Sequence, residues 1–313
     1  FERFTRDGIR SGIDQFETAV AIEPRFALAW GQLGLAYAMQ GMFGFTPPAK
    51  SKEQFHAAEL QAIEADPQVA LGHSGLGAAL WYKWEFADAC ESFEDALRLN
   101  PWEPYAIHGD SDCLLFEGRF DESIARAREL LTISPFSTMH SLPLPGHLYM
   151  ARRTDEAITA VKAMQARVPK YSLHWMLARF SWQQGRFGEA LKEERLELQR
   201  RGDTVLLAAL EEGLDAGGPS GAMRAIAEAL VTRAKEIYVD PSDIAELYAR
   251  AGLVDEALFF LEKAVRTSSF EETFIAFWPH WDILRDDPRF QDLLVQVYGE
   301  RAQEISRPAI SSR

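Results

Sequence analysis

The densest group of side chains that could do chemistry lies late in the chain, in the segment FWPHWDILRDDPRF (residues 277–290). Its aspartates, Asp282, Asp286 and Asp287, could form the carboxylate pair that general acid–base catalysis uses, provided that a pocket perturbs one pKa. However, an aspartate followed by proline is typical of a helix start, with Asp287 as the N-cap and Pro288 in the first turn. A hydrolase or transferase that uses these acids is therefore the weakest of the functional hypotheses.

The familiar motifs of catalytic and nucleotide-binding proteins are missing from the sequence. The segment AGGPSG lacks the lysine and the preceding strand of a phosphate loop, and neither G-x-S-x-G nor H-E-x-x-H occurs. Four histidines fall on predicted helices, but a metal ion needs three or four ligands converging within about 2.0–2.3 Å, which their spacing does not establish. These four are His108, His140, His147 and His174. We therefore predict no enzymatic activity, no metal and no cofactor.

Composition indicates a soluble globular protein that does not bind nucleic acid. The chain has 313 residues, 47% hydrophobic and 26% charged, and no apolar run of the roughly 18 residues that a membrane span needs. A net charge of −14 opposes the basic surface on which non-specific nucleic-acid binding depends. Residues 236–300 contain 14 acids and 5 bases, which fits solvated helix faces or a docking surface for a basic partner.

The two cysteines and the first residue bear on where the protein works. Cys90 and Cys113 show no metal-ligand spacing, and two thiols in so long a chain indicate small buried side chains in a reducing compartment rather than a disulfide framework. We therefore expect a cytoplasmic location. The chain opens at Phe1 inside a predicted helix, so we expect it to be part of a longer protein.

Prolines divide much of the chain into equal segments. Pro67, Pro101, Pro135 and Pro169 follow one another at intervals of 34 residues. Before each lies a stretch with helical apolar spacing: LQAIEADP, EDALRLNP, RELLTISP and KAMQARVP, with ETAVAIEP earlier, ending at Pro24. Because proline stops a helix and a fixed period of this length is typical of repeat architectures, we predict stacked helical hairpins.

The residues after these prolines carry a family resemblance. Trp30, Leu33, Gly34 and Tyr37 follow Pro24 at i, i+3, i+4 and i+7. Matching offsets recur in the next two segments, at Leu76, Gly77, Leu80, Ala89, Phe93 and Ala96, and then at Leu114, Gly118 and Ser123. The pattern resembles the tetratricopeptide repeat (TPR), a helix–turn–helix unit of 34 residues. The resemblance implies an all-α, right-handed α-α superhelical solenoid, with small residues where helices touch and large ones, such as Phe93, between repeats.

The parse from this pattern gives three regions. Residues 1–201 form a TPR solenoid, with a lone helix at 9–22 and repeats near 27–66, 70–100, 104–134, 138–168 and 172–201. Residues 202–303 form two looser helical pairs, at 203–235 and 241–267, and a C-terminal cap, and residues 304–313 form a flexible tail. The first repeat carries extra residues around 39–54, Pro143 and Pro145 should kink or delay a helix, and DAGGPSG (215–221) should be a hinge or loop.

A terminal helix should cover the exposed last face of the solenoid. Phe290, Leu293, Leu294 and Val297 make one apolar helical stripe after Arg289. We expect Trp278 and Trp281 to wedge between this cap and the helix around residues 259–261. The segment at 277–290 is then a cap rather than a catalytic site.

A narrower resemblance appears in the same region. EIYVDPSDIAELYARAGLVDEALFFLEKAV (236–265), followed by DILRDDPRFQDLL (282–294), resembles the closing portion of TPR regions in bacterial signalling proteins. In that group the output domain is a winged-helix DNA-binding domain, a class III nucleotide cyclase or a Ser/Thr kinase. The resemblance implies a regulatory role, with the output domain outside this chain.

Family resemblance also places a candidate ligand groove on the first helices of the repeats. Its lining would be Trp81, Tyr105, His108, Asp112, Tyr149, Met176, Phe180 and Gln183. The lysine, arginine and asparagine set with which some TPR proteins clamp an acidic peptide is missing, since the first repeats have Gly31, Leu35, Ser74 and Ala78 at the matching positions. An aromatic groove suits an extended peptide or a partner helix, although part of this stripe could instead be core packing.

Three functions remain open from the sequence. The leading hypothesis is a non-catalytic interaction or sensory module that binds a peptide, protein or small ligand in the groove, with no direct contact to nucleic acid or membrane. The alternative is self-association, which would make the chain a homodimer and is compatible with the first. The enzyme hypothesis, based on the late aspartates, comes third.

Overall fold

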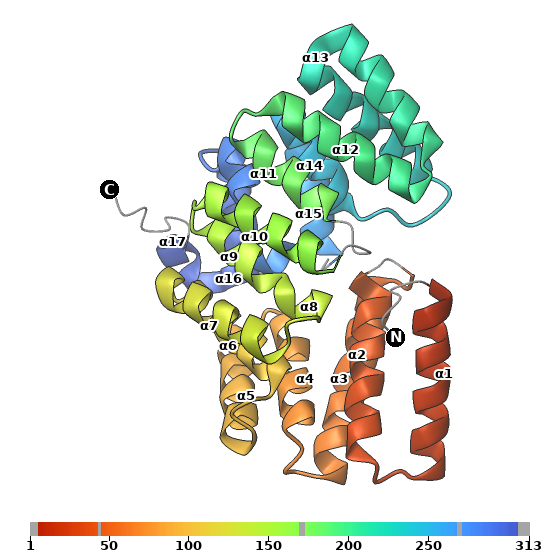
Figure 1. Ribbon diagram of the computed structural model, residues 1–313, viewed down its shortest axis with the longest axis vertical. Helices are drawn as coiled ribbons and strands as arrows, with labels where there is room; N and C mark the ends of the chain where they lie inside the picture. Colours follow the sequence, from red (N-terminus) through yellow and green to blue (C-terminus); the bar gives the residue numbers. More distant parts are fainter. Residues whose placement is uncertain (1–5, 43–44, 169–172, 268–270, 306–313) are drawn as a thin grey trace. The chain divides into compact units, whose positions relative to one another are not determined.

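The computed structural model describes residues 6–42, 45–168, 173–267 and 271–305, and every regular element in these ranges is helical (Figure 1). The predicted all-α class is confirmed. The chain divides into two compact units, Phe1–Pro135 with Thr267–Thr273, and Phe136–Arg266 with Phe274–Arg313. We call them the N-terminal and C-terminal units. The predicted region boundary after residue 201 stays a prediction, and residues 306–313 of the predicted tail lie outside the described ranges.

The N-terminal unit is a series of helical hairpins. Each helix packs on the next in the chain, and α2, α4 and α6 also lie side by side (Figure 1). The helices are α1 (Arg6–Ile22), α2 (Ala27–Met42), α3 (Pro48–Ala65), α4 (Ala70–Trp81), α5 (Phe86–Leu99), α6 (Pro104–Phe116) and α7 (Phe120–Ile133). These ranges follow the repeats predicted from the prolines, and the extra residues of the first repeat lie mainly in α2 and α3, which have 16 and 18 residues against 12–14 in α4 to α7.

Close packing in this unit depends on glycine and alanine at the predicted contact positions. A Cβ atom on Gly77 would lie 2.7 Å from the ring of Phe93, and one on Gly109, in the next repeat, would lie 2.3 Å from the same ring. Ala89 and Ala96 of α5 are fully buried. Phe93 therefore fills the space between two repeats, as predicted, because the facing residues have no side chain.

The C-terminal unit continues the hairpins less regularly and ends in short elements. Its members are α8 (Thr138–Ser141), α9 (Pro143–Met150), α10 (Thr154–Arg167), α11 (His174–Gln183), α12 (Phe187–Arg201), α13 (Thr204–Arg233), α14 (Pro241–Ala251), α15 (Val254–Arg266), η2 (Pro279–Leu284), α16 (Pro288–Tyr298), η3 (Gly299–Arg301) and α17 (Ala302–Ile305). The short 3-10 helix η1 (Glu271–Phe274) precedes the last group. Pro143 starts α9 afresh after α8, which confirms the delayed helix predicted for this repeat.

Two glycines break α13 where the sequence predicted a hinge or loop. Gly217 and Gly218 have non-helical backbone angles, and Gly218 has a φ of +64° that favours glycine. Pro219 follows at once and cannot donate the backbone hydrogen bond of a continuous helix. The long element is therefore two helices joined at a kink, and Gly213 and Gly221 on its two arms approach so closely that a Cβ on either would meet the other's carbonyl oxygen.

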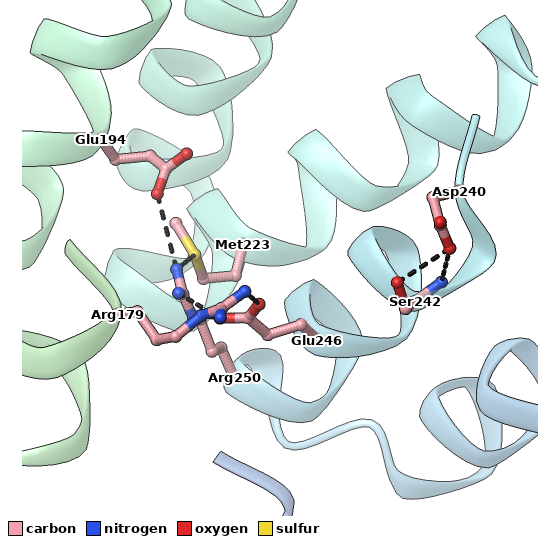
Figure 2. Close-up of polar contacts among 7 residues, drawn as sticks. All are labelled: Arg179, Glu194, Met223, Asp240, Ser242, Glu246 and Arg250. Atoms are coloured by element: carbon pink, nitrogen blue, oxygen red, sulfur yellow. Dashed lines mark hydrogen bonds and ion pairs between the residues drawn. The ribbon is translucent and has the colours of Figure 1, made fainter. Parts of the chain in front are cut away.

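Acid–proline pairs fix several helix starts. Asp287 accepts a hydrogen bond from the backbone N–H of Arg289 at 2.9 Å, with Pro288 in the first turn. Asp240 likewise accepts from the backbone N–H and hydroxyl of Ser242 before α14 (Figure 2). The predicted N-cap role of Asp287 is confirmed.

The predicted C-terminal cap is present, but the tryptophan contacts differ from those expected. Phe290, Leu293, Leu294 and Val297 are all buried on α16, which packs on α15. Trp281 is buried too, in η2, which packs on α14, α11 and α15. The ring of Trp278 lies beside Tyr149, Phe274 and His280, neighbours that the sequence did not predict.

The two cysteines form a disulfide, so the expectation of separate thiols is wrong. Cys90 of α5 and Cys113 of α6 are bonded, with their Cα atoms 5.9 Å apart. The second helix of one repeat packs on the first helix of the next, which brings together residues 23 positions apart. The inference of a reducing, cytoplasmic location rested on free thiols and loses that support. Among the described residues, no helix is both long and apolar enough to cross a membrane.

Candidate functional site

The predicted groove residues divide into a buried and an accessible group. Trp81, Tyr149, Met176 and Phe180 are between 0% and 3% exposed. Trp81 packs edge-on against Phe86 and Phe116, while Tyr149 stacks on Phe180 with ring centroids 4.3 Å apart. The accessible group is Tyr105, His108 and Asp112 in the N-terminal unit and Gln183 in the C-terminal unit.

The face of α6 presents three of these side chains together. Tyr105, His108 and Asp112 lie at helical spacing along α6 and are partly exposed. Nε2 of His108 lies 3.8 Å from Oδ2 of Asp112, and their side chains are 25% and 15% exposed. Burial, with the charges of Glu103 and Glu59 added, raises the pKa of Tyr105 to about 12. We call these three residues the α6 face.

A fully buried glutamate lies close to this face. Glu59 of α3 is 0% exposed, and neither of its carboxyl oxygens has a hydrogen-bond partner. A Cβ on Gly34 of α2 would lie 2.1 Å from Oε1, and one on Gly75 of α4 would lie 2.3 Å from Oε2. Only glycine at these two positions leaves room for the carboxyl group between the first helices of adjacent repeats.

A second acid, Glu103, caps α6 near the first. It is 6% exposed and accepts a hydrogen bond from the backbone N–H of Ala106 at 2.7 Å. Burial raises its pKa, while the hydrogen bonds to Ala106 and Ser74 oppose the rise. Burial and then the charge of Glu103 raise the pKa of Glu59 well above its usual value. The α6 face therefore adjoins two buried acids.

The raised pKa of Glu59 predicts how stability depends on pH. The folded state holds a proton on Glu59 that the unfolded state releases above about pH 4.5, so stability falls as pH rises from there toward the folded pKa. We expect the free energy of unfolding of the wild type, from urea titrations, to fall more between pH 5 and pH 8 than that of Glu59→Gln. Glu53→Gln, at an exposed position of the same helix, should keep the wild-type slope. Equal slopes in wild type and Glu59→Gln would contradict the prediction.

The C-terminal unit holds a buried ion-pair network (Figure 2). Arg179 of α11 grips the carboxylate of Glu246 of α14 with two nitrogens, Nε lying 2.9 Å from Oε1. Arg250, one turn further along α14, binds the same Oε1 and also reaches Oε2 of Glu194 at 3.5 Å. The side chains of Arg179, Glu246 and Arg250 are 11%, 8% and 7% exposed.

The charges of this network set its protonation states. Burial raises the pKa of Glu246, but Arg179 and Arg250 outweigh burial and hold it well below the usual range. Burial lowers the pKa of nearby His280 well below its usual value, so this histidine is neutral at pH 7. Charged hydrogen bonds of this kind are strong when every partner is present. The network thus fastens α11 to α14 and α12.

The three late aspartates that suggested catalysis have different surroundings in the structure. Asp287 caps α16 and pairs with Arg289, Asp286 is exposed, and Asp282 pairs with Arg152 and Arg285. Within the ranges that the structure describes, no three His, Cys, Asp or Glu side chains converge so as to hold a metal ion.

The structure adds residues that the sequence did not single out. Glu59, Glu246 and Arg250 looked like ordinary charged residues on amphipathic helices, and only their burial distinguishes them. One signal was available for Glu59: the glycines at positions 34 and 75, where neighbouring repeats would otherwise clash with its carboxyl group. No comparable signal in the sequence marks the pairing of Arg179 with Glu246, 67 residues apart.

Comparison with known proteins supports the repeat pattern directly. Residues 147–203, which run from α9 through α12, match the tetratricopeptide repeat family model. This segment of the chain therefore resembles tetratricopeptide repeats. The matched TPR segment lies in the C-terminal unit, although the most regular proline spacing lies largely in the N-terminal unit.

Several solved structures resemble the chain at low identity, and the two with a TM-score above 0.5 share its fold. The human IFIT1 dimer with PPP-AAAA is 15% identical, with a TM-score of 0.54 and coverage of 83% of this chain and 69% of that one. Human IFIT1 with m7Gppp-AAAA is 14% identical, with a TM-score of 0.55 and coverage of 83% and 68%. YrrB, described as a TPR protein with an unusual peptide-binding site, is 15% identical, with a TM-score of 0.39 and coverage of 63% and 97%. At these identities the likeness concerns the fold alone. No curated protein matches the sequence.

Proposed function

We propose that the chain is a non-catalytic interaction module that binds a basic peptide or protein segment on the α6 face. The observation that carries this proposal is the combination of Tyr105, His108 and Asp112, partly exposed together on one helix. An aromatic side chain on the same helix face as the carboxyl group of Asp112 suits a partner segment that contains lysine or arginine, through hydrogen bonds and cation–π contact.

The neighbouring helices support a groove rather than an isolated patch. The first helices α2, α4 and α6 lie side by side, so a segment bound at Tyr105 would run across them. Small residues allow α2 and α4 to pack closely, since a Cβ on Gly31 of α2 would lie 3.0 Å from the side chain of Leu71 on α4. TPR folds host many different partners, so the fold alone gives only the kind of function and the side chains must give the partner's chemistry.

We place this module in a bacterial signalling or transcription-regulatory protein. The support is the resemblance of residues 236–265 and 282–294 to the closing portion of TPR regions in such proteins. In that setting the partner would regulate an output domain. This signalling role is independent of the binding proposal, and evidence against it would leave the binding proposal intact.

The binding proposal predicts that variants of the α6 face lose affinity for a basic peptide and that this affinity depends on salt. We expect Tyr105→Ala and Asp112→Asn each to weaken binding of a selected basic peptide by at least tenfold, because each removes a partner of the cationic side chain. Peptides would be selected from a random display library on the whole chain, and affinities measured by fluorescence polarisation at two salt concentrations. Raising the salt should weaken wild-type binding.

Trp102→Ala provides the matched control. Trp102 is an aromatic residue of the same repeat, 64% exposed, in the connection before α6. It should leave affinity unchanged. Selected peptides without basic residues, or affinities that Tyr105→Ala and Asp112→Asn leave intact, would refute the α6 assignment.

A further inference from the structure

Arg152 has an unusual backbone for an arginine. It follows α9 at the turn between the two helices of its repeat, with a φ of +63°. Glycine occupies the corresponding turn in three other repeats, at Gly118, Gly185 and Gly252, with φ between +70° and +79°. This left-handed conformation strains a residue with a side chain and is relaxed only for glycine. An arginine kept where glycine would be relaxed indicates that its side chain has a use.

The guanidinium groups of Arg152 and Arg285 both bind the same carboxylate oxygen of Asp282. Nη2 of Arg152 lies 2.8 Å from Oδ1 of Asp282, and Nε of Arg285 lies 2.5 Å from the same atom. Arg285 also donates from Nη2 to the backbone carbonyl of Trp278 at 3.4 Å. Two arginines thus converge on one carboxylate oxygen within the C-terminal unit.

Four buried donors on these two arginines and on Trp278, whose backbone carbonyl binds Arg285, have no acceptor. Nε and Nη1 of Arg152, Nη1 of Arg285 and the indole Nε1 of Trp278 are all shielded from solvent and make no hydrogen bond. Guanidinium and indole N–H groups can only donate. A buried donor without a hydrogen bond destabilises the folded state, more so when it is charged, so four together call for an acceptor with several oxygens.

The local charge also favours an anion. Among the described residues, Arg152 and Arg285 pair with Asp282, while Arg179 and Arg250 pair with Glu246 and Arg250 also with Glu194, in a chain whose net charge is −14. Burial raises the pKa of Glu194, while the charge of Arg250 opposes the rise. Burial lowers the pKa of Arg152, with Asp282 opposing and Arg285 adding to the fall. Neutral His280 contributes no positive charge that would alter this balance at pH 7.

We propose that Arg152, Arg285 and the indole of Trp278 form a binding site for an oxyanion group, phosphate or carboxylate, in which Asp282 is a resident carboxylate that the ligand displaces. Asp282 is the most exposed of the paired groups, at 39% of its side chain, against 23% for Arg152 and 17% for Arg285. Its departure would open the inner N–H groups to a ligand. The forked guanidinium geometry matches the oxygens of either anion. This site lies outside the N-terminal unit and does not depend on the function proposed for the α6 face.

The test uses inorganic phosphate and acetate as separate probes of the whole chain. A ligand that binds only the folded state raises Tm, so we expect at least one probe to raise the wild-type Tm by about 2 °C or more over sodium chloride of equal ionic strength. A shift with phosphate but not acetate assigns a phosphate ligand, and the reverse assigns a carboxylate. Calorimetric titration then gives the affinity.

Four variants separate a binding site from a structural ion pair. Arg152→Gly should abolish the shift while the protein stays folded, because glycine relaxes this turn in three other repeats. Trp278→Phe, which keeps the ring but loses the N–H, should weaken binding at least threefold. Asp282→Asn should strengthen binding because it removes the competing charge, whereas a purely structural pair predicts only a lower Tm. Trp84→Gly is the matched control and should keep the full shift, because Trp84 is the second non-glycine residue with a left-handed backbone (φ +67°) in the part of the chain that the structure describes.

Two results would overturn the proposal. One is a wild-type Tm that neither probe shifts beyond the chloride control, which would mean that the unpaired donors are satisfied by water only. The other is a shift that survives Arg152→Gly unchanged, which would place the anion elsewhere on the protein.

Discussion

Replacing Glu246 by glutamine should lower the free energy of unfolding by about 3–5 kcal/mol, because removing one member of a buried ion network leaves its partners charged and uncompensated. Arg179 and Arg250 both bind this carboxylate, and all three side chains are nearly inaccessible to water. Glutamine keeps the size of glutamate but can offer only one acceptor oxygen. Urea unfolding followed by circular dichroism at pH 7 would measure the loss.

The matched control is an Arg–Glu pair with the same spacing on the surface. Arg224 and Glu228 lie 3.8 Å apart at i and i+4 on α13, with side chains 53% and 63% exposed. Glu228→Gln should change stability by less than about 0.5 kcal/mol, since exposed pairs are screened by water. A Glu246→Gln loss as small as that of the control would show that the network is solvated in solution.

The sign of the pH dependence of Glu246 follows from the direction of its shift. Its folded pKa is depressed, so its stabilisation is present above the unfolded pKa near 4.5 and is lost as pH falls through the lower folded value. Glu59 has the opposite sign, because its folded pKa is raised. The two glutamates therefore stabilise the protein at opposite ends of the acid range, and each belongs to a different unit.

Trp281→Ala should cost about 3–5 kcal/mol, the usual range for removing a large aromatic side chain from a core. Trp281 is 4% exposed and contacts His280 edge-on, with ring centroids 4.5 Å apart. Its segment, η2, packs on three helices of the C-terminal unit, so the cavity would lie under the cap. Denaturant titration of the variant measures the loss.

Trp102→Ala is again the control, since that ring is 64% exposed and should contribute under about 1 kcal/mol. If Trp281→Ala cost no more than Trp102→Ala, the ring would be solvent-exposed in solution. The segment at 277–290 would then have to be reconsidered as a lid over a ligand.

The elements of this fold could be predicted from the sequence because each is specified locally. Pro67 and Pro101 mark the helix ends, and the acid before Pro288 marks a start. Gly217 and Gly218 mark the kink in α13. Each of these signals acts through the backbone of one or two residues. Its place in the sequence therefore shows directly where a helix begins, ends or kinks.

The chemistry could not be predicted as well, because it depends on burial and on pairs far apart in sequence. Tyr149 and Phe180 had the spacing of groove residues, yet their rings stack on each other inside the unit. Helical spacing shows which residues share one face of a helix. It does not show whether that face is exposed or buried, because in a repeat protein neighbouring repeats cover parts of both faces. Arg152 and Asp282 are 130 residues apart, and only the folding back of the last segment brings them together.

The disulfide is another pair that the sequence did not predict, and it affects how the protein unfolds. In a stack of hairpins, each hairpin contacts mainly its neighbours, so unfolding can begin at an end and spread one hairpin at a time. Cys90 and Cys113 join two successive hairpins by a covalent bond. Unfolding that starts at α1 can release α1 to α4 by breaking non-covalent contacts alone. It then reaches the disulfide between α5 and α6, which heat or mechanical force does not break. The hairpins that carry the α6 face therefore remain tethered after the first repeats have been lost.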